Sequence, residues 1–219
     1  ASDVYKRQLP KSKKMIGGAA ISVKQINDET MHMLSLAYEN VNQAFDQLLQ
    51  FSDKTDEQIY KREDTVNYLD KVISEYISTA LATPNLNVNI SQALSSYYLM
   101  LVDIERISDY AVNMNHQATK RLQGDMTISE IEIIEHMKKL CEDMKNDLDD
   151  VEEAERKDDV IDSLVSSWRE AQIQALKQKK CSSEVSMMLS RIFTDFERIN
   201  DHALNVSQEL DKITFEIPD

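Results

Sequence analysis

Glycine, proline and cysteine are scarce in this chain of 219 residues, which has 3 Gly, 3 Pro and 2 Cys. So few backbone breakers cannot supply the many turns of an all-β fold or a glycine-rich phosphate-binding loop. Cys141 and Cys181 form no CxxC motif, and two lone thiols are typical of a reducing compartment. No apolar run approaches the roughly 20 residues of a membrane-spanning helix. We therefore expect no direct membrane insertion of this segment.

Positive charge is also in short supply, because 25 Lys and Arg stand against 39 Asp and Glu, a net charge of −14. Nucleic acids and anionic lipids are polyanions that such a chain repels, so we expect no nucleic-acid partner. Cations are its natural counterpart. What the chain does have is 42% hydrophobic and 29% charged residues with 10 Met, a composition that is typical of long amphipathic helices around a sizeable core.

Apolar residues recur at steps of three and four along six segments, which predicts an all-α fold. The expected helices span about 20–51, 56–82, 90–121, 127–151, 154–179 and 183–212. Thr55 with Gln58 and Thr127 with Glu130 predict capping boxes, and Gly124 predicts a left-handed C-cap.

Matching helix lengths and loops divide the chain into two sets of three helices. The sequence predicts two tandem, pseudo-symmetric three-helix bundles placed end to end, at residues 20–124 and 125–219. Residues 1–19, which carry five basic side chains, are expected to be a flexible leader or linker.

An internal repeat supports this division. Residues 103–113 and 195–205, offset by 92, are identical at seven of eleven positions. A weaker pair, 63–69 and 158–164, is offset by 95. The chain is therefore a tandem duplication.

Carboxylates recur at i and i+4 within the repeated segments. Glu105 and Asp109 lie on one helix face, opposite the apolar Ile104, Ile107 and Ala111. Two such carboxylates repel each other, and a cation held by carboxylates of adjacent helices would offset the repulsion. The candidate metal ligands are Glu63, Glu105, Asp109, Asp158, Asp162, Glu197 and Asp201.

The doubled block resembles the signature of the PhoU family, a helix with the pattern Glu-Arg-Ile-x-Asp-(His)-x-x-Asn that occurs twice in a pair of three-helix bundles. The stretches 105–109 and 197–202 match it, with Asn113 and Asn205 closing each. The resemblance implies a non-enzymatic cytoplasmic protein of phosphate homeostasis that binds iron or zinc foremost, and otherwise manganese or magnesium, through the candidate ligands. Asn67 departs from the pattern, which has Asp there, so we rank the second repeat as the better metal binder.

Two kinds of PhoU protein fit the sequence. One is the regulatory domain that follows the membrane domain of a bacterial sodium/phosphate cotransporter, on the cytoplasmic face of the inner membrane. The basic leader and the Trp168-Arg169 pair resemble this kind, which we favour. The alternative is a free-standing regulator that acts on a phosphate transporter and its sensor kinase. The partners are then a transporter membrane domain or phosphate-signalling proteins, and a homodimer is left open.

Two other protein classes remain as rivals. A carboxylate-bridged di-iron oxidase or ferritin-like protein needs Glu-x-x-His on two helices, and the sequence has only Glu29 with His32. The second rival is a metal-free helical adaptor whose methionines dock a partner helix. Methionines at this spacing are more often core residues. The candidate docking residues are Met31, Met33, Met187 and Met188. The scattered His116, His136 and His202 are expected to be structural, with His202 beside Asp201 as the exception to test.

Overall fold

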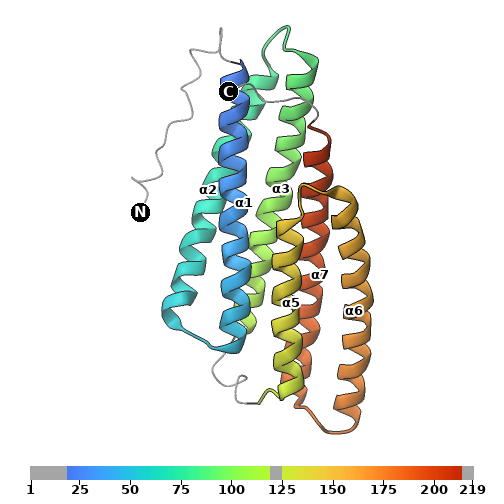
Figure 1. Cartoon of the computed structure of the whole chain (residues 1–219). Coiled ribbons are helices and arrows are strands. Elements are labelled where there is room, and N and C mark those ends of the chain that lie inside the picture. Colours follow the sequence, from blue (N-terminus) through green and yellow to red (C-terminus); the bar gives the residue numbers. More distant parts are fainter. Residues whose placement is uncertain (1–18, 119–124, 214–219) are drawn as a thin grey trace.

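The computed structural model describes residues 19–118 and 125–213, with side chains from residue 23 onward, and these residues form helices and no strands. The fold class is therefore all-α, as predicted. The helices are α1 (Ala19–Leu49), α2 (Asp53–Leu81), α3 (Val88–Gln117), α5 (Ile128–Asn146), α6 (Val151–Lys177) and α7 (Ser183–Asp211) (Figure 1). None of these described helices is both long and apolar enough to cross a membrane.

The helix starts follow side-chain caps, some of which the sequence identifies. Thr127 and Glu130 form the predicted capping box of α5, and Ser182 caps α7. The predicted start of the second helix at Thr55 is wrong, because Ser52 accepts a hydrogen bond from the Thr55 amide and α2 begins at Asp53. A serine three residues earlier is an equally good N-cap, and it places an additional acidic residue in the first turn, near the positive end of the helix dipole.

Two predicted helix ends are also wrong. The fourth helix was expected to reach Val151, but α5 ends at Asn146 and Val151 begins α6, because Asp150 caps α6 through the Glu153 amide. The third helix ends at Gln117, short of residue 121. The predicted C-cap at Gly124 and the leader at residues 1–18 lie outside the described residues.

The two sets of helices lie side by side and antiparallel, which corrects the expected end-to-end placement (Figure 1). α3 packs against α1, α2 and α7, and α1 also packs against α5. The buried apolar residues of both sets form one continuous core, in which the rings of Phe45 and Phe196 meet edge to face at 6.4 Å. Because the core is shared, the division into domains at residues 20–124 and 125–219 stays a prediction.

The register of α3 is the predicted one. Ile104, Ile107 and Ala111 are fully buried, so Glu105 and Asp109 lie on the opposite side of the helix. The shared core therefore directs the repeated carboxylates outward on α3 and, through the same spacing, on α7.

Candidate metal centre

The carboxylates of the first repeat face one another across α2 and α3. Burial, and then the charge of Asp109, raises the pKa of Glu105; Arg106 lowers it in part, and the charges of Asp70 and Glu63 raise it further. Burial likewise raises the pKa of Glu63; hydrogen bonds from Ser108 and Asn67 lower it in part, and the charges of Asp109 and Asp64 raise it further. The structure thus brings three of the predicted ligands, Glu63, Glu105 and Asp109, into one acidic cluster.

A buried network of polar side chains positions Glu63. Its Oε2 atom accepts a hydrogen bond from the hydroxyl of Ser108, which itself accepts one from Asn40 Nδ2 at 3.1 Å. Asn40 Oδ1 in turn accepts from Arg62 Nη1 at 2.7 Å. The other oxygen of Glu63, Oε1, is buried with no hydrogen-bond partner. The carboxylate is therefore held mainly through Oε2, and the Asn67 amide is a weaker, additional donor to it.

Asp70 belongs to the same cluster, although the sequence analysis missed it. It lies on α2, its pKa is raised by burial, and its charge acts on Glu105. Its spacing could have revealed it, because Asp70 follows Glu63 by seven residues and Asn67 by three, which places all three on one helix face. Asp70 supplies the first repeat with a carboxylate that Asn67 does not.

The second repeat gathers a different set of carboxylates between α6 and α7. Burial, and then the charges of Asp162, Asp201 and Asp159, raises the pKa of Asp158 to about 6. Two other predicted ligands, Asp162 and Asp201, therefore lie close enough to Asp158 to repel it.

Glu197, the fourth predicted ligand of this repeat, pairs with a cation of the protein itself. Arg169 Nη2 on α6 donates to Glu197 Oε2 at 2.6 Å. The arginine of each signature also pairs with the aspartate three residues later, at 3.3 Å for Arg106 and Asp109 and at 3.2 Å for Arg198 and Asp201. These ion pairs offset part of the carboxylate repulsion.

The carboxylate oxygens are of the type that cations prefer as ligands, although the side chains do not converge on one point. Among the described residues, no group of three or more His, Cys, Asp or Glu side chains has the arrangement of a metal site. Carboxylate oxygens are nevertheless the ligands that hard divalent cations prefer. The partnerless Oε1 of Glu63 and the raised pKa of Asp158 both indicate a need for positive charge. The assignment of the seven ligands stays a prediction.

The histidines make other contacts. His202 Nδ1 lies 2.8 Å from Asp103 Oδ1 across the α3–α7 interface, and its ring stacks on Tyr110 at 5.8 Å. His116 packs against Tyr60, and His136 packs against Trp168. His202 therefore joins the two repeats with an oxygen partner that is not among the predicted ligands.

Comparison with known proteins adds the family. The model of the PhoU domain family matches residues 30–118 and again residues 131–210. A curated relative, the phosphate-specific transport system accessory protein PhoU homolog 1 of Thermotoga maritima, is 22% identical over 197 residues, which cover 84% of each chain.

Two solved structures share the fold. PhoU from Pseudomonas aeruginosa has a TM-score of 0.78 at 18% identity, covering 90% of this chain and 97% of that one. The phosphate transport system regulatory protein PhoU from Streptococcus pneumoniae has a TM-score of 0.76 at 19% identity, covering 92% and 99%. With the family match on both halves, the doubled signature and the paired helical sets, the chain belongs to the PhoU family.

Proposed function

We propose that this protein is a free-standing regulator of phosphate transport that binds cations at its two carboxylate clusters. The observation that carries the regulatory part is the match of the PhoU domain model to both halves of the chain. The similar proteins are named as an accessory protein and a regulatory protein of phosphate transport. Regulation without catalysis, in the cytoplasm, is part of this proposal.

The comparisons favour the free-standing regulator over the cotransporter domain that the sequence suggested. Two of the proteins that the chain resembles carry the names of a transport-system accessory protein and a transport-system regulatory protein. Its partner is then a phosphate transporter or a phosphate-signalling protein that is a separate chain.

The cation would be held by the carboxylates that now repel one another. In the second repeat these are Asp158 and Asp162 of α6 with Asp201 of α7, and in the first repeat Glu63 of α2 with Glu105 and Asp109 of α3. A bound cation would supply positive charge between two helices of each set and so tie them together. Its absence would leave the helices repelling each other, which gives a regulator two states of different stiffness.

Metal analysis of untagged protein tests the cation part of the proposal. We expect stoichiometric iron, zinc or manganese in the wild type and its loss from the second cluster in the double variant D158N/D201N. The matched control is D149N/E152Q, which removes two charges from exposed positions nearby that do not act on Asp158. Metal-free wild-type protein whose thermal stability does not respond to added cation would contradict it.

Phosphate uptake by cells tests the regulatory part separately. Deletion of the gene in its host should raise uptake in phosphate-replete medium, and the wild-type gene should restore repression. Uptake that is unchanged by the deletion would contradict a role in phosphate transport, whatever metal the protein binds.

A further inference from the structure

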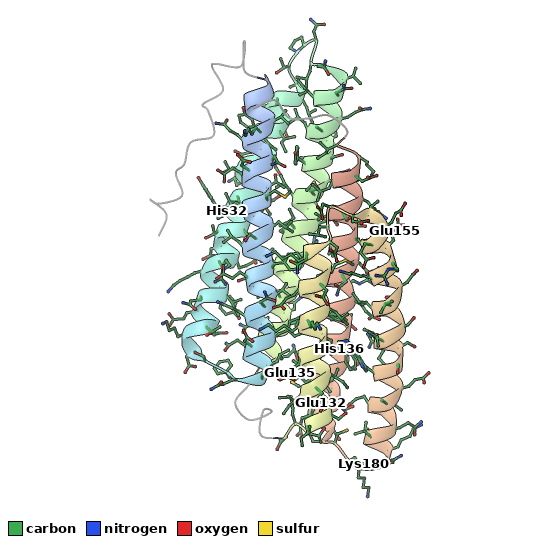
Figure 2. All side chains as sticks on the ribbon, viewed as in Figure 1. His32, Glu132, Glu135, His136, Glu155 and Lys180 are labelled. Atoms are coloured by element: carbon green, nitrogen blue, oxygen red, sulfur yellow. The ribbon has the colours of Figure 1, made fainter. Side chains whose placement is uncertain are left out.

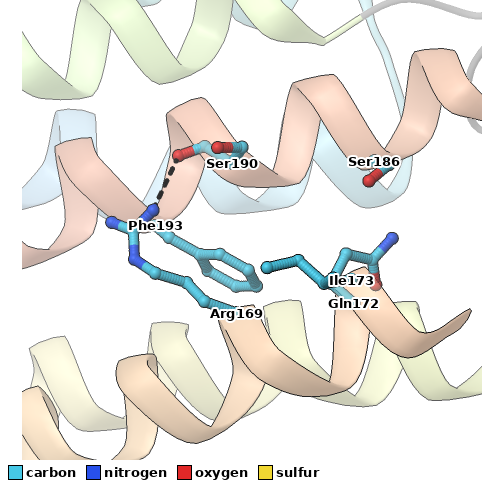
Figure 3. Close-up of a pocket in the computed structure, with 6 residues that line it drawn as sticks. All are labelled: Arg169, Gln172, Ile173, Ser186, Ser190 and Phe193. Atoms are coloured by element: carbon cyan, nitrogen blue, oxygen red, sulfur yellow. Dashed lines mark hydrogen bonds between the residues drawn. The ribbon is translucent and has the colours of Figure 1, made fainter. Parts of the chain in front are cut away.

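The α6–α7 end of the second repeat carries a surface that shares Arg169 with the second carboxylate cluster and Phe193 with the core, and extends beyond both. We name it the α6–α7 groove. It consists of a pocket, an apolar rim and three lysines at the turn between the two helices. The pocket, of about 170 Å³, is lined by Arg169, Gln172, Ile173, Ser186, Ser190 and Phe193 (Figure 3).

The pocket has an apolar floor and a fixed polar end. Phe193 is fully buried, and the Arg169 guanidinium lies 5.6 Å from the centre of its ring. Arg169 also donates to the carbonyl of Ser190 at 3.4 Å, so its side chain is held in place (Figure 3). Since an engineered cavity of about 150 Å³ accommodates benzene, this pocket has room for one aromatic or branched aliphatic side chain.

Large apolar side chains are also exposed on α6 and α7 next to the pocket residues in sequence. Ile173 is 52% exposed and Met187 is 61% exposed, and Leu176 follows one turn after Ile173 at 39%. Met33 and Met188 are buried in the core, and Met31 packs against it, so Met187 is the one adaptor candidate among the four methionines that faces solvent. Such a run of exposed apolar side chains beside a pocket is typical of an interaction site.

The charge of this end is opposite to that of the rest of the protein. Residues 171–190 contain three Lys and one Glu, a net charge of +2, whereas the whole chain carries −14. Lys177, Lys179 and Lys180 are all exposed, and Figure 2 shows Lys180 at the tip of the α6–α7 turn. The matching stretch of the first repeat, residues 76–98, has no charged residue. The lysines are therefore not a requirement of the duplicated fold.

We propose that the α6–α7 groove docks an acidic amphipathic helix of a partner protein. The helix would insert one aromatic or branched aliphatic side chain into the pocket, lay its apolar face on Ile173, Leu176 and Met187, and place its carboxylates against the three lysines. The concave pocket favours a protein side chain over the flat surface of a membrane. This inference goes beyond the proposed function and depends on neither phosphate nor metal.

The basic sequence of residues 1–18 does not suit the role of this acidic helix, because its positive charges would be repelled by the three lysines.

Binding of a labelled peptide tests the proposal. The probe is an amphipathic helix of about 18 residues, roughly five turns, with Leu and one Phe on its apolar face and Glu on the other. We expect saturable micromolar binding by fluorescence anisotropy. The same peptide with Lys in place of Glu, and one with its apolar positions scrambled, should bind at least roughly tenfold more weakly.

Two variants and two matched controls locate the binding. S190W fills the pocket from an exposed position, and K177E/K179E/K180E reverses the basic charge; each should weaken binding roughly tenfold or more. The controls S95W on α3 and K54E/K61E/K71E on α2 make the same changes at exposed positions elsewhere and should leave binding unchanged. Circular dichroism confirms that each variant is folded.

Three results would overturn the proposal. One is equal binding of the acidic and basic peptides. Another is peptide binding that S190W does not weaken. The last is that the protein binds phosphatidylglycerol vesicles and not the acidic peptide, and that the lysine variant abolishes this vesicle binding while S190W leaves it intact. That pattern would identify a membrane-contact surface.

Discussion

Substitution of Asp158 by asparagine should stabilise the protein at alkaline pH and not at acid pH. Burial, and then the charges of Asp162, Asp201 and Asp159, raises the pKa of Asp158 from its ordinary value of 3.8 to about 6. In the unfolded chain the same carboxyl titrates at about 3.9. Because the folded pKa is the higher one, the native state binds the proton more tightly than the unfolded state does.

The sign and size of the effect follow from this difference. The stabilising contribution of the protonated carboxyl is complete below pH 4 and is lost as the pH rises through 6. A rise from 3.8 to about 6 corresponds to roughly 3 kcal/mol. Asp158 is only half-buried, and solvent screening reduces the figure to about 1 kcal/mol. D158N avoids the cost of ionisation, so it should be more stable than the wild type by about that amount at pH 8.

Denaturation by urea at a series of pH values measures this difference directly. The gain in the free energy of unfolding should grow from near zero at pH 4 to its full value at pH 8. E170Q is the matched control, because Glu170 is exposed on the same helix and its charge is not among those that act on Asp158, and it should change stability little at any pH. An equal gain for D158N at pH 4 and pH 8 would refute the electrostatic origin. Added divalent cation should raise the melting temperature of the wild type at pH 8 more than that of D158N, because the cation and the substitution each remove the same carboxylate repulsion.

Three further substitutions test other parts of the structure. R169A frees the carboxylate of Glu197, so the cation affinity measured by calorimetry should rise roughly twofold to fivefold. The control R156A breaks an arginine–glutamate pair within α6 and should leave the cation affinity unchanged. S108A leaves its two polar partners, Asn40 and Glu63, unsatisfied, so it should lower the free energy of unfolding in urea by about 1–3 kcal/mol. S95A, at an exposed position on the same helix, is the control and should lower it little. K179G should raise the free energy of unfolding by about 1 kcal/mol, because Lys179 follows the C-cap of α6 in the left-handed conformation, at φ 55°. No gain would show that this conformation costs nothing there.

Much of the fold follows from the sequence because helices are local structures. The apolar spacing on α3 correctly places Ile104, Ile107 and Ala111 in the core, and the Thr127 capping box is present. Helix faces do not specify which helices meet, however. The side-by-side packing of the two sets depends on the wide apolar surface of α3, which buries residues against α1, α2 and α7 together.

The sequence predicts the motif of the candidate site but not which side chains of different helices pair with one another there. The repeated carboxylates could be chosen by spacing alone, yet Arg169 reaches Glu197 from 28 residues away, and Ser108 reaches Glu63 from 45 residues away. Such contacts between helices require the angle and register of packing, which a single sequence does not contain. Asp70 is the exception, since its spacing from Glu63 was visible.

The two repeats place one motif in two electrostatic settings, and the difference bears on which binds a cation more tightly. Asn67 alone favours the second repeat. The structure adds the carboxylate of Asp70 to the first cluster, whereas the matching position of the second repeat is the buried Val165. It also adds the positive charge of Arg169 to the second cluster. With every carboxylate that acts on a ligand counted, the first cluster sums to five carboxylates and one arginine, or −4, from Glu63, Asp64, Asp70, Glu105, Asp109 and Arg106. The second sums to five carboxylates and two arginines, or −3, from Asp158, Asp159, Asp162, Glu197, Asp201, Arg169 and Arg198. Since cation affinity rises with the negative charge of the ligand set, Asp70 and Arg169 together outweigh Asn67, and the first repeat should bind at least as tightly as the second.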